Sequence, residues 1–278
     1  MNIISLGLGV QSTALYFMSS MGELPRADYA ITADPGREKA GTYKYLQFLL
    51  QWQSDNSGIP IIVTDKKNLF EDLLKGTNSS GNRFASIPCF TKNDDGSQGM
   101  LRRQCTSEYK IGPVDEVIRR LYGMRPRQRR PETFVWKGIT VDELDRMSEP
   151  EQKWKRHVYP FTGYQFNAKG IWEKLNWGIQ MSRVDLYNWY QKMGFPIPPK
   201  SSCVFCPYQS DLNWSRMKKH NPEDFDAAVQ VDYAIRNSTQ KGVKNQCFLH
   251  RSMTPLDMVE FDDQDDLWSG ECSGNCHI

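Results

Sequence analysis

Short apolar runs alternate with amphipathic segments along the first half of the chain. The runs cover residues 3–6, 29–33, 60–64 and 133–139. Between them, residues 11–21, 38–53 and 106–122 have helical periodicity, and Tyr45, Phe48 and Trp52 fall on one side of the second segment. This alternation predicts an α/β fold, a parallel twisted sheet with helices on both faces, which binds ligands at the carboxyl ends of its strands.

The rest of the chain has a different pattern. Residues 76–99 are rich in Gly, Ser, Asn and Asp and lack periodicity, which predicts a long loop, either a lid or disordered. Aromatic residues dominate after Glu143, where we expect two or three helices and then a long helix at 222–237. We divide the chain into an α/β core, residues 1–145, and a helical, Cys-containing C-terminal region, residues 146–278, packed on it as one compact unit.

The amino-acid composition limits the classes of protein to which the chain can belong. The 278 residues include 35 Lys and Arg against 33 Asp and Glu, a net charge of +2. This balance argues against a polybasic nucleic-acid coat but permits a local basic groove. No apolar run approaches the roughly 20 residues that span a bilayer. The N-terminus lacks the basic region of a signal peptide, so we expect a cytoplasmic protein with no membrane partner.

The cysteines indicate metal or redox chemistry. There are seven, an odd number and too few for a disulfide scaffold in a chain of this length. Cys203 and Cys206 form a Cys-x-x-Cys pair followed by proline, a spacing that binds one metal or cluster or forms a redox disulfide. Cys89 and Cys247 have apolar neighbours and are expected to be buried and inert. The candidates to complete a metal site are Cys105, Cys272 and Cys276.

The turn between the first predicted strand and helix contains glycines and hydroxyl residues. Glycines let the backbone approach an anion, and the helix amides with the hydroxyls can hold phosphate oxygens. An ordinary tight turn is the alternative. The turn lacks the Gly-Lys-Ser/Thr of a Walker A loop and the third glycine of a dinucleotide fingerprint. The candidate phosphate-binding residues are Gly7, Gly9, Gln11, Ser12 and Thr13.

The same turn resembles the PP-loop of the adenine nucleotide α-hydrolase superfamily, whose core is Ser-Gly-Gly-x-Asp-Ser. The aligned residues are Gly7-Leu8-Gly9-Val10-Gln11-Ser12. The first Ser, the first Gly and the Asp of the motif are therefore replaced in this chain.

Three further stretches resemble motifs of the phosphoadenosine phosphosulfate (PAPS) reductase branch, in the family's order. They are Asp34-Pro35-Gly36-x-Glu38 followed by Thr42, then Arg103-x-Cys105-Thr106-x-x-Tyr109-Lys110-x-x-Pro113, then Gly138-Ile139-Thr140-x-Asp142-Glu143-x-x-Arg146. With the Cys-x-x-Cys pair they cover about residues 3–207. The chain is thus identified as a member of the PAPS reductase-like family of the PP-loop superfamily.

The resemblance implies an enzyme that binds an adenine nucleotide, either ATP or a sulfonucleotide (PAPS or APS). Phosphate would lie on the glycine-containing turn and near Gly138, and Asp34 would orient the ribose. Lys110, a candidate catalytic cation, and Arg146 would neutralise the anion. A turn or cap role for Asp34 and a surface charge for each cation are the alternatives.

Two ligand sets remain open for the cysteines. In the first, which we favour, Cys105, Cys203, Cys206 and Cys276 hold an iron–sulfur cluster beside the nucleotide. In the second, Cys272 replaces Cys105 and the four thiolates bind zinc. A third alternative is that none of the cysteines binds metal.

The C-terminal tail adds a further role for its thiols. It reads Glu271-Cys272-Ser273-Gly274-Asn275-Cys276-His277. This resembles the Glu-Cys-Gly-x-His ending of PAPS and APS reductases, whose cysteine attacks the sulfur of the sulfonucleotide. Cys272 and Cys276 are therefore also candidate nucleophiles.

Three classes of function follow. The first is a reductase in which a thiol attacks a sulfonucleotide and sulfite is released, or an enzyme that cleaves at the α-phosphate. The second is an ATP-dependent adenylating sulfurtransferase (an ATP pyrophosphatase) that modifies a nucleic acid or a small molecule. There the arginine-rich stretch from Arg119 to Arg130 would contact the nucleic acid, unless it is only a solvated helix end. A thiol reductant or a sulfur-donor protein is an expected partner. The third is a non-catalytic nucleotide- or nucleic-acid-binding module with a structural metal.

Overall fold

The computed structural model describes residues 1–64, 67–93, 95–125, 128–167, 169–241 and 243–262. The chain forms two compact units, each assembled from separate segments. The first unit comprises Met1–Ala33, Gly41–Thr64 and Val114–Ser201, and the second comprises Asp34–Ala40, Asp65–Pro113 and the chain from Ser202 onward. This division differs from the boundary we expected between residues 145 and 146. The reason is that two long connections between strands of the first unit join the C-terminal chain in the second.

The first unit is built on a seven-stranded sheet with the order β3-β2-β1-β6-β7-β8-β9. The five strands from β3 to β7 run parallel, and β8 and β9 extend the sheet antiparallel. The strands are β1 (Asn2–Ser5), β2 (Tyr29–Ala33), β3 (Ile61–Thr64), β6 (Thr133–Trp136), β7 (Lys155–Tyr159), β8 (Tyr164–Phe166) and β9 (Trp172–Lys174). The predicted α/β class and the four predicted strands are therefore confirmed, in a mostly parallel mixed sheet.

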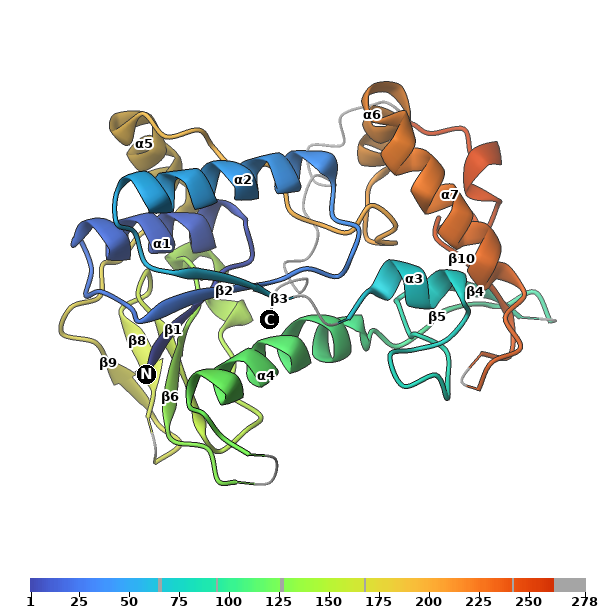
Figure 1. Cartoon of the computed structure of the whole chain (residues 1–278). Coiled ribbons are helices and arrows are strands. Elements are labelled where there is room, and N and C mark those ends of the chain that lie inside the picture. The colour runs from blue at the N-terminus through green and yellow to red at the C-terminus, as the bar shows by residue number, and fades with distance from the viewer. Residues whose placement is uncertain (65–66, 94, 126–127, 168, 242, 263–278) are drawn as a thin grey trace. The chain divides into compact units, whose positions relative to one another are not determined.

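Helices cover both faces of this sheet. The helices α1 (Val10–Met21), α2 (Ala40–Asp55) and α5 (Arg183–Met193) lie on one face, and α4 (Gly112–Leu121) lies on the other (Figure 1). Side chains alternate along β1, so Ile4 belongs to the core shared with α1, whereas Ile3 packs with Val117 and Ile118 of α4. Alternating burial of this kind fixes each strand between its two layers of helices.

The segment after Glu143 is where the predicted secondary structure is wrong. We expected helices, but residues 155–174 contain β7, β8 and β9, and α5 follows. Aromatic side chains pack well on a pleated surface, and Tyr159 and Phe166 are buried there. An aromatic-rich segment without a clear period is therefore equally compatible with strands.

The second unit combines a small antiparallel sheet with helices. The sheet has the order β10-β4-β5, made of β10 (Gln246–Phe248), β4 (Phe90–Lys92) and β5 (Gln98–Met100). The helices are α3 (Leu69–Leu74), the π-helix η1 (Thr106–Ile111), α6 (Asp211–His220), α7 (Pro222–Arg236) and the short 3-10 helix η3 (Leu256–Met258). Leu73, Trp214 and Val231 are fully buried in its core. The predicted long helix is α7, whereas residues 76–99, predicted as a loop, contain β4 and part of β5.

The helices of the two units bear on whether the chain could cross a membrane. Among the residues that the structure describes, none of the helices combines the length and apolar character needed to cross a bilayer.

Candidate functional site

The turn between β1 and α1 leaves the N-terminus of the helix without a side-chain cap. Gly9 is the N-cap, in an extended conformation, and no side-chain cap hydrogen bond is found at this helix end among the described residues. The Ser12 hydroxyl instead holds the turn, accepting from the Gly7 amide at 3.1 Å and donating to the Gly9 carbonyl at 3.3 Å. A Cβ atom at Gly9 would have no other heavy atom of the described residues within 4 Å. An uncapped helix N-terminus beside open space suits an anion.

Leu8 has a backbone conformation that favours glycine. Its φ angle is 57°, in the left-handed region, and its side chain is buried. Leu8 stands where the PP-loop motif has its first glycine. The turn therefore has the glycine-type conformation at the position of the motif's glycine, although the residue is leucine.

Gly138 fixes the turn after β6 against the first turn of α1. A Cβ atom there would lie 2.7 Å from both the Gln11 carbonyl carbon and the Ser12 amide nitrogen. Only glycine fits, so the two backbones are in direct contact. β1 and β6 are neighbouring parallel strands, and the strand order reverses between them. Their carboxyl ends therefore flank the switch point at which α/β sheets bind ligands.

A polar network connects Gln11 with the 3-10 helix η2 (Val141–Arg146) at this edge. The Gln11 amide donates to the Thr140 hydroxyl at 3.3 Å and to the Glu143 carboxylate. Glu143 also pairs with Arg146 at 2.8 Å and with Arg183 at 3.8 Å. The structure thus brings together the predicted residues Gln11, Gly138 and Arg146, and it pairs the Arg146 charge with a carboxylate.

The structure also describes Thr13 and Asp34, two other residues that we predicted to bind the nucleotide. Thr13 is fully buried, so its hydroxyl belongs to the core and not to the open face of the turn. Asp34 belongs to the second unit and accepts a hydrogen bond from the Gly36 amide at 2.8 Å. That bond makes a turn of the kind we gave as the alternative for Asp34. Gly36 is required there, because its φ is 96° and a Cβ atom would lie 2.1 Å from Asn68.

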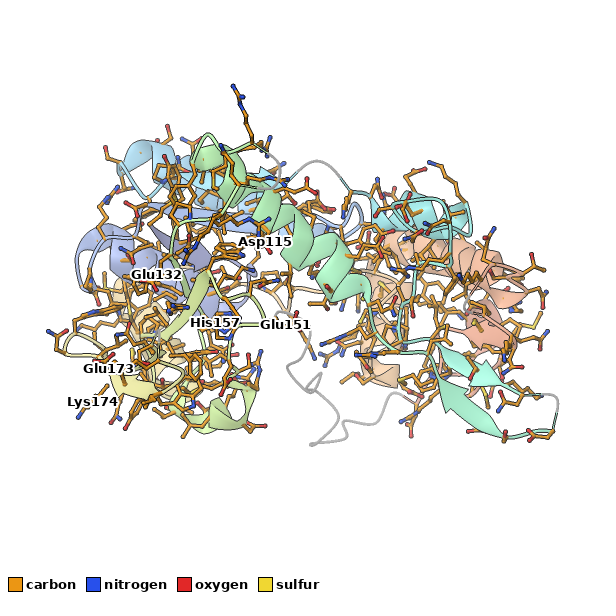
Figure 2. The ribbon with its side chains drawn as sticks, turned by 90° about the horizontal axis from the view of Figure 1, so that it is seen from below. Asp115, Glu132, Glu151, His157, Glu173 and Lys174 are labelled. Carbon is orange, nitrogen blue, oxygen red and sulfur yellow. The ribbon has the colours of Figure 1, made fainter. Side chains whose placement is uncertain are left out.

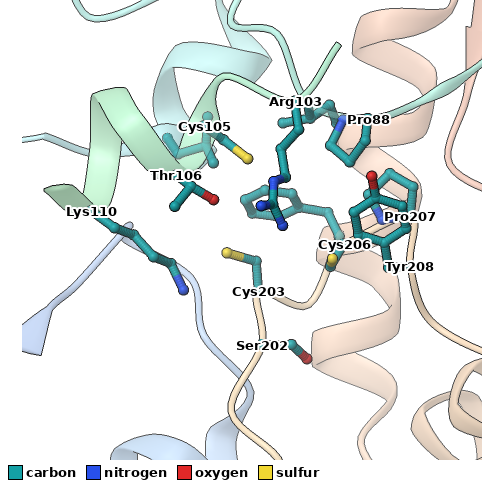
Figure 3. Close-up of a pocket in the computed structure, with 13 residues that line it drawn as sticks. Pro88, Arg103, Cys105, Thr106, Lys110, Ser202, Cys203, Cys206, Pro207 and Tyr208 are labelled. Atoms are coloured by element: carbon teal, nitrogen blue, oxygen red, sulfur yellow. The ribbon is translucent and has the colours of Figure 1, made fainter. Parts of the chain in front are cut away.

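The second unit contains a pocket with about 440 Å³ of empty space, open solvent included. Three cysteines line it: Cys105, Cys203 and Cys206 (Figure 3). The Cys105 and Cys203 sulfur atoms point into the space between their two segments. Apolar side chains form much of the remaining wall, among them Ile87, Phe205 and Pro207. The three described members of the predicted cluster set therefore surround one cavity.

Local backbone structure presents these thiols. Cys203 and Cys206 lie on a tight turn in which the Cys206 amide donates to the Cys203 carbonyl at 3.1 Å. The Val204 amide anchors this turn on the Arg37 carbonyl, also at 3.1 Å. Cys105 immediately precedes the π-helix η1, a rare element that often marks functional sites.

Glu38 is a site residue that sequence reasoning did not single out. It is 4% exposed. Its Oε1 atom accepts from the Lys110 ammonium at 3.1 Å and from the Cys203 thiol at 3.9 Å. The available signal was its place in the Asp-Pro-Gly-x-Glu stretch. The carboxylate balances the Lys110 charge and is placed to accept the Cys203 proton.

Arg103 adds a cation to the pocket. Its side chain lines the cavity, and its Nη1 atom is buried with no hydrogen-bond partner among the described residues. Figure 3 shows the guanidinium extending between the cysteine segments. A buried donor without an acceptor costs free energy, so an anionic ligand in this pocket would satisfy a group that the protein leaves unpaired.

The cysteines do not form a closed site for one metal ion by themselves. Within the described part of the chain, no group of at least three His, Cys, Asp or Glu residues is arranged to hold a metal ion. The predicted ligands and nucleophiles Cys272 and Cys276 lie outside the described residues. The donor type still fits an iron–sulfur cluster, which thiolates bind.

Cys89 and Cys247 are buried, as predicted. A hydrogen bond with Cys247 and burial raise the pKa of Cys89, which keeps this thiol protonated. A neutral, buried thiol is a poor nucleophile. Both cysteines, each 0% exposed, belong to the core of the second unit.

The arginine-rich stretch is only partly engaged in packing. The Arg130 guanidinium lies 4.6 Å from the centre of the Trp154 ring and 3.9 Å from the Asp115 carboxylate. Arg120, Arg125 and Arg129 are exposed. Arg127 lies outside the described residues. The exposed arginines are the part of this stretch that a polyanion could reach.

Comparisons of the chain with protein-family models, with curated proteins and with solved structures find no match. We therefore infer function from the geometry and chemistry of the two sites.

Proposed function

We propose that the chain is an adenine-nucleotide-binding enzyme of the PAPS reductase type, acting on a sulfonucleotide or on ATP. The observation that carries this proposal is the contact between Gly138 and the first turn of α1. It sets an uncapped helix N-terminus at the carboxyl ends of β1 and β6, where backbone amides can bind phosphate without a P-loop lysine. The positive φ of Leu8 supports a PP-loop in this position.

The sulfur chemistry of this proposal needs a thiolate, and Cys203 of the second unit is one candidate. A Cys203 thiolate, its proton accepted by Glu38, attacks the sulfur of the sulfonucleotide. The S–O bond breaks, the nucleotide leaves with the electron pair, and the sulfo group stays on the cysteine. A second thiolate then forms a disulfide with that cysteine and releases sulfite, and an external thiol reduces the disulfide. Cys272 and Cys276 remain the alternative nucleophiles.

The cysteine pocket is also the proposed place of an iron–sulfur cluster. Cys105, Cys203 and Cys206, with Cys276, would hold it, and a cluster would supply redox or sulfur-transfer chemistry. In that case the thiol nucleophile would be Cys272. Metal content and the visible spectrum of anaerobically purified protein test this assignment. Iron–sulfur absorbance that is lost in Cys105→Ala supports it. A colourless protein with one zinc, retained in Cys105→Ala, refutes it.

Product analysis tests the reaction. Incubation with PAPS and a thiol donor is expected to release sulfite, and Gly138→Val is expected to abolish the release. Pyrophosphate released from ATP in place of sulfite would instead assign the chain to the ATP-dependent class. If neither nucleotide binds, the proposed function is wrong.

A second candidate function is an adenylating sulfurtransferase that acts on a nucleic acid. The specific observation in its favour is the exposure of Arg120, Arg125 and Arg129. Phosphate contacts by arginines make binding fall steeply with salt. Pyrophosphate release from ATP that is stimulated by RNA or DNA at low salt, and reduced when these three arginines are replaced by alanine, would favour this candidate.

A further inference from the structure

The residue after β6 is a lysine that neither the phosphate loop nor the cysteine pocket explains. Lys137 follows the strand directly and precedes Gly138. Its side chain is 9% exposed. Within the described part of the chain, no hydrogen bond or ion pair involves its ammonium group. Burial of most of a lysine without an ion-pair partner disfavours the charged form, because that form loses part of its hydration.

The strand register places Lys137 on the face of the sheet that α4 covers. Thr133 pairs with Lys155 and Val135 with His157, so alternation puts Lys137 on the same face as these β7 residues. Figure 2 views the molecule from the side of α4 and labels Asp115 and His157.

The other polar groups on this face already have partners. The Lys155 ammonium lies 2.6 Å from Asp115 of α4. His157 Nδ1 donates to the Ser148 carbonyl at 2.8 Å, and the Tyr159 hydroxyl donates to the same carbonyl at 2.8 Å. Lys155 thus has a buried carboxylate as its partner, whereas no such partner is found for Lys137 in the part of the chain that the structure describes.

The charges around Lys137 disfavour its protonated form. Burial, assisted by the positive charges of Lys155 and Arg146 and opposed by Glu151, lowers the pKa of Lys137 to about 7. Burial and Lys137 together lower the pKa of His157 to about 3, so the histidine stays neutral. Asp115 is held by Lys155. An added negative charge would therefore stabilise the lysine ammonium.

We propose that Lys137 binds an anionic group of the nucleotide, a phosphate or sulfate, at the carboxyl end of β6. This inference rests on the proposed function, because the next residue, Gly138, contacts Gln11 and Ser12 of the candidate phosphate loop. Arg146, whose charge acts on the Lys137 ammonium, pairs with Glu143 in the polar network that includes Gln11 of that loop. The ammonium acts as a point charge, as lysine does in other phosphate sites.

Binding should then be coupled to proton uptake. At pH 8, above the pKa of about 7, most Lys137 side chains are neutral in the free protein. An anion that pairs with the ammonium raises the pKa of Lys137 and draws a proton from the buffer. A lysine with a purely structural role would not take up a proton when the nucleotide binds.

Titration calorimetry with PAPS and with ATP at pH 8, in buffers of different ionisation enthalpy, tests this inference. The wild-type protein is expected to take up close to one proton per nucleotide bound. Lys137→Met is expected to bind about tenfold or more weakly, without proton uptake, because a hydrogen bond to a charged group is lost. Lys137→Arg should bind within a few-fold of wild type and also without uptake. Lys174→Met, which alters an exposed lysine of β9, is the matched control and should behave as wild type.

The outcomes separate this inference from the proposed function. Nucleotide binding without proton uptake, together with unchanged affinity in Lys137→Arg and Lys137→Met, overturns the role of Lys137 and leaves the nucleotide site standing. If Lys137→Met does not fold, proton uptake that persists in Lys137→Arg overturns the inference equally. Absence of binding to the wild-type protein overturns both.

Discussion

The sheet edge of the first unit is shaped by backbone, whereas the pocket of the second unit is shaped by side chains. At the sheet edge, Gly138 allows one turn to lie against the backbone of Gln11 and Ser12. In the pocket, thiols from separate segments, such as Cys105 and Cys203, surround one cavity. The first arrangement suits an anion held by amides, and the second suits chemistry at sulfur.

The two regions are alike in how their positively charged side chains are paired. Each contains a cation that a buried carboxylate balances, Lys155 with Asp115 in one and Lys110 with Glu38 in the other. Each also contains a cation for which no carboxylate partner is found among the described residues: the buried Lys137 in the first unit, and Arg103, whose Nη1 atom is buried, in the second. In each pair the carboxylate neutralises its cation, whereas Lys137 and Arg103 are the cations that we propose for anionic ligands.

The largest effect is expected from a side chain at Gly138. Gly138→Val would place carbon atoms within 3 Å of the Gln11 and Ser12 backbone. Moving these turns apart should cost about 3 kcal/mol of unfolding free energy and abolish nucleotide binding. Urea unfolding and titration calorimetry measure the two effects. The control is Gly9→Ala, where nothing lies within 4 Å; equal loss of stability in both variants would contradict the close contact at Gly138.

A comparable loss is expected when the charge pair of the second unit is broken. Glu38→Gln leaves Lys110 without its carboxylate, and breaking a buried pair on one side costs about 3 kcal/mol. The matched control is Glu71→Gln, which breaks the exposed Lys75–Glu71 pair and should cost under about 0.5 kcal/mol. Urea unfolding compares the two variants. A Glu38→Gln protein as stable as its control would show that the pair does not stabilise the pocket.

His157, on the sheet face that α4 covers, should make the free energy of unfolding depend on pH. His157 stays neutral when folded, because burial and Lys137 lower its pKa from 6.5 to about 3. The unfolded chain binds a proton near the ordinary pKa, so this contribution to stability is complete above pH 6.5 and decreases progressively toward pH 3. Between pH 6.5 and 5 the loss should be about 2 kcal/mol.

The variant His157→Asn, whose amide can still donate to Ser148, should remove that part of the pH dependence. Unfolding free energies measured at several pH values test this. The exposed His220 is the control residue, and His220→Asn should leave the slope unchanged. An unchanged slope in His157→Asn would mean that this histidine is protonated in the folded protein.

The smallest effect is expected at the pocket of the second unit. Arg103→Met should slow alkylation of the pocket thiols by iodoacetate relative to neutral iodoacetamide by about tenfold, equivalent to 1.4 kcal/mol. Mass spectrometry of chelator-treated protein gives this ratio for Cys105, Cys203 and Cys206. Arg102→Met alters the exposed neighbouring arginine and should leave the ratio unchanged. Equal ratios in the two variants would remove Arg103 as an anion-binding group.

The sequence predicted those parts of the molecule that local patterns determine. The strands β1, β2, β3 and β6 are short apolar runs, and α1, α2, α4 and α7 have helical periodicity, so both kinds of element were found. The turn at Gly7 and Gly9 and the Cys203–Cys206 pair were also visible, because each depends on residues close together in the chain. The resemblance to family motifs added Gly138 and Arg146.

The parts that the sequence did not predict depend on contacts between distant segments. The strands β8 and β9 have three residues each, too few for a period to be recognised. Glu38 and Arg103 acquire their significance from the turn that carries Cys203, far along the chain. Lys137 was not noticed, because a lysine at a strand end is ordinary until its burial is known.

Hydrogen exchange with and without nucleotide tests most directly the central claim that the carboxyl ends of β1 and β6 bind an adenine nucleotide. Mass spectrometry would follow the backbone amides of the whole chain with PAPS or ATP present at saturation. Our account predicts slower exchange in peptides that cover residues 5–15 and 136–143. Unchanged exchange in both segments, while a nucleotide is bound elsewhere on the chain, would contradict it.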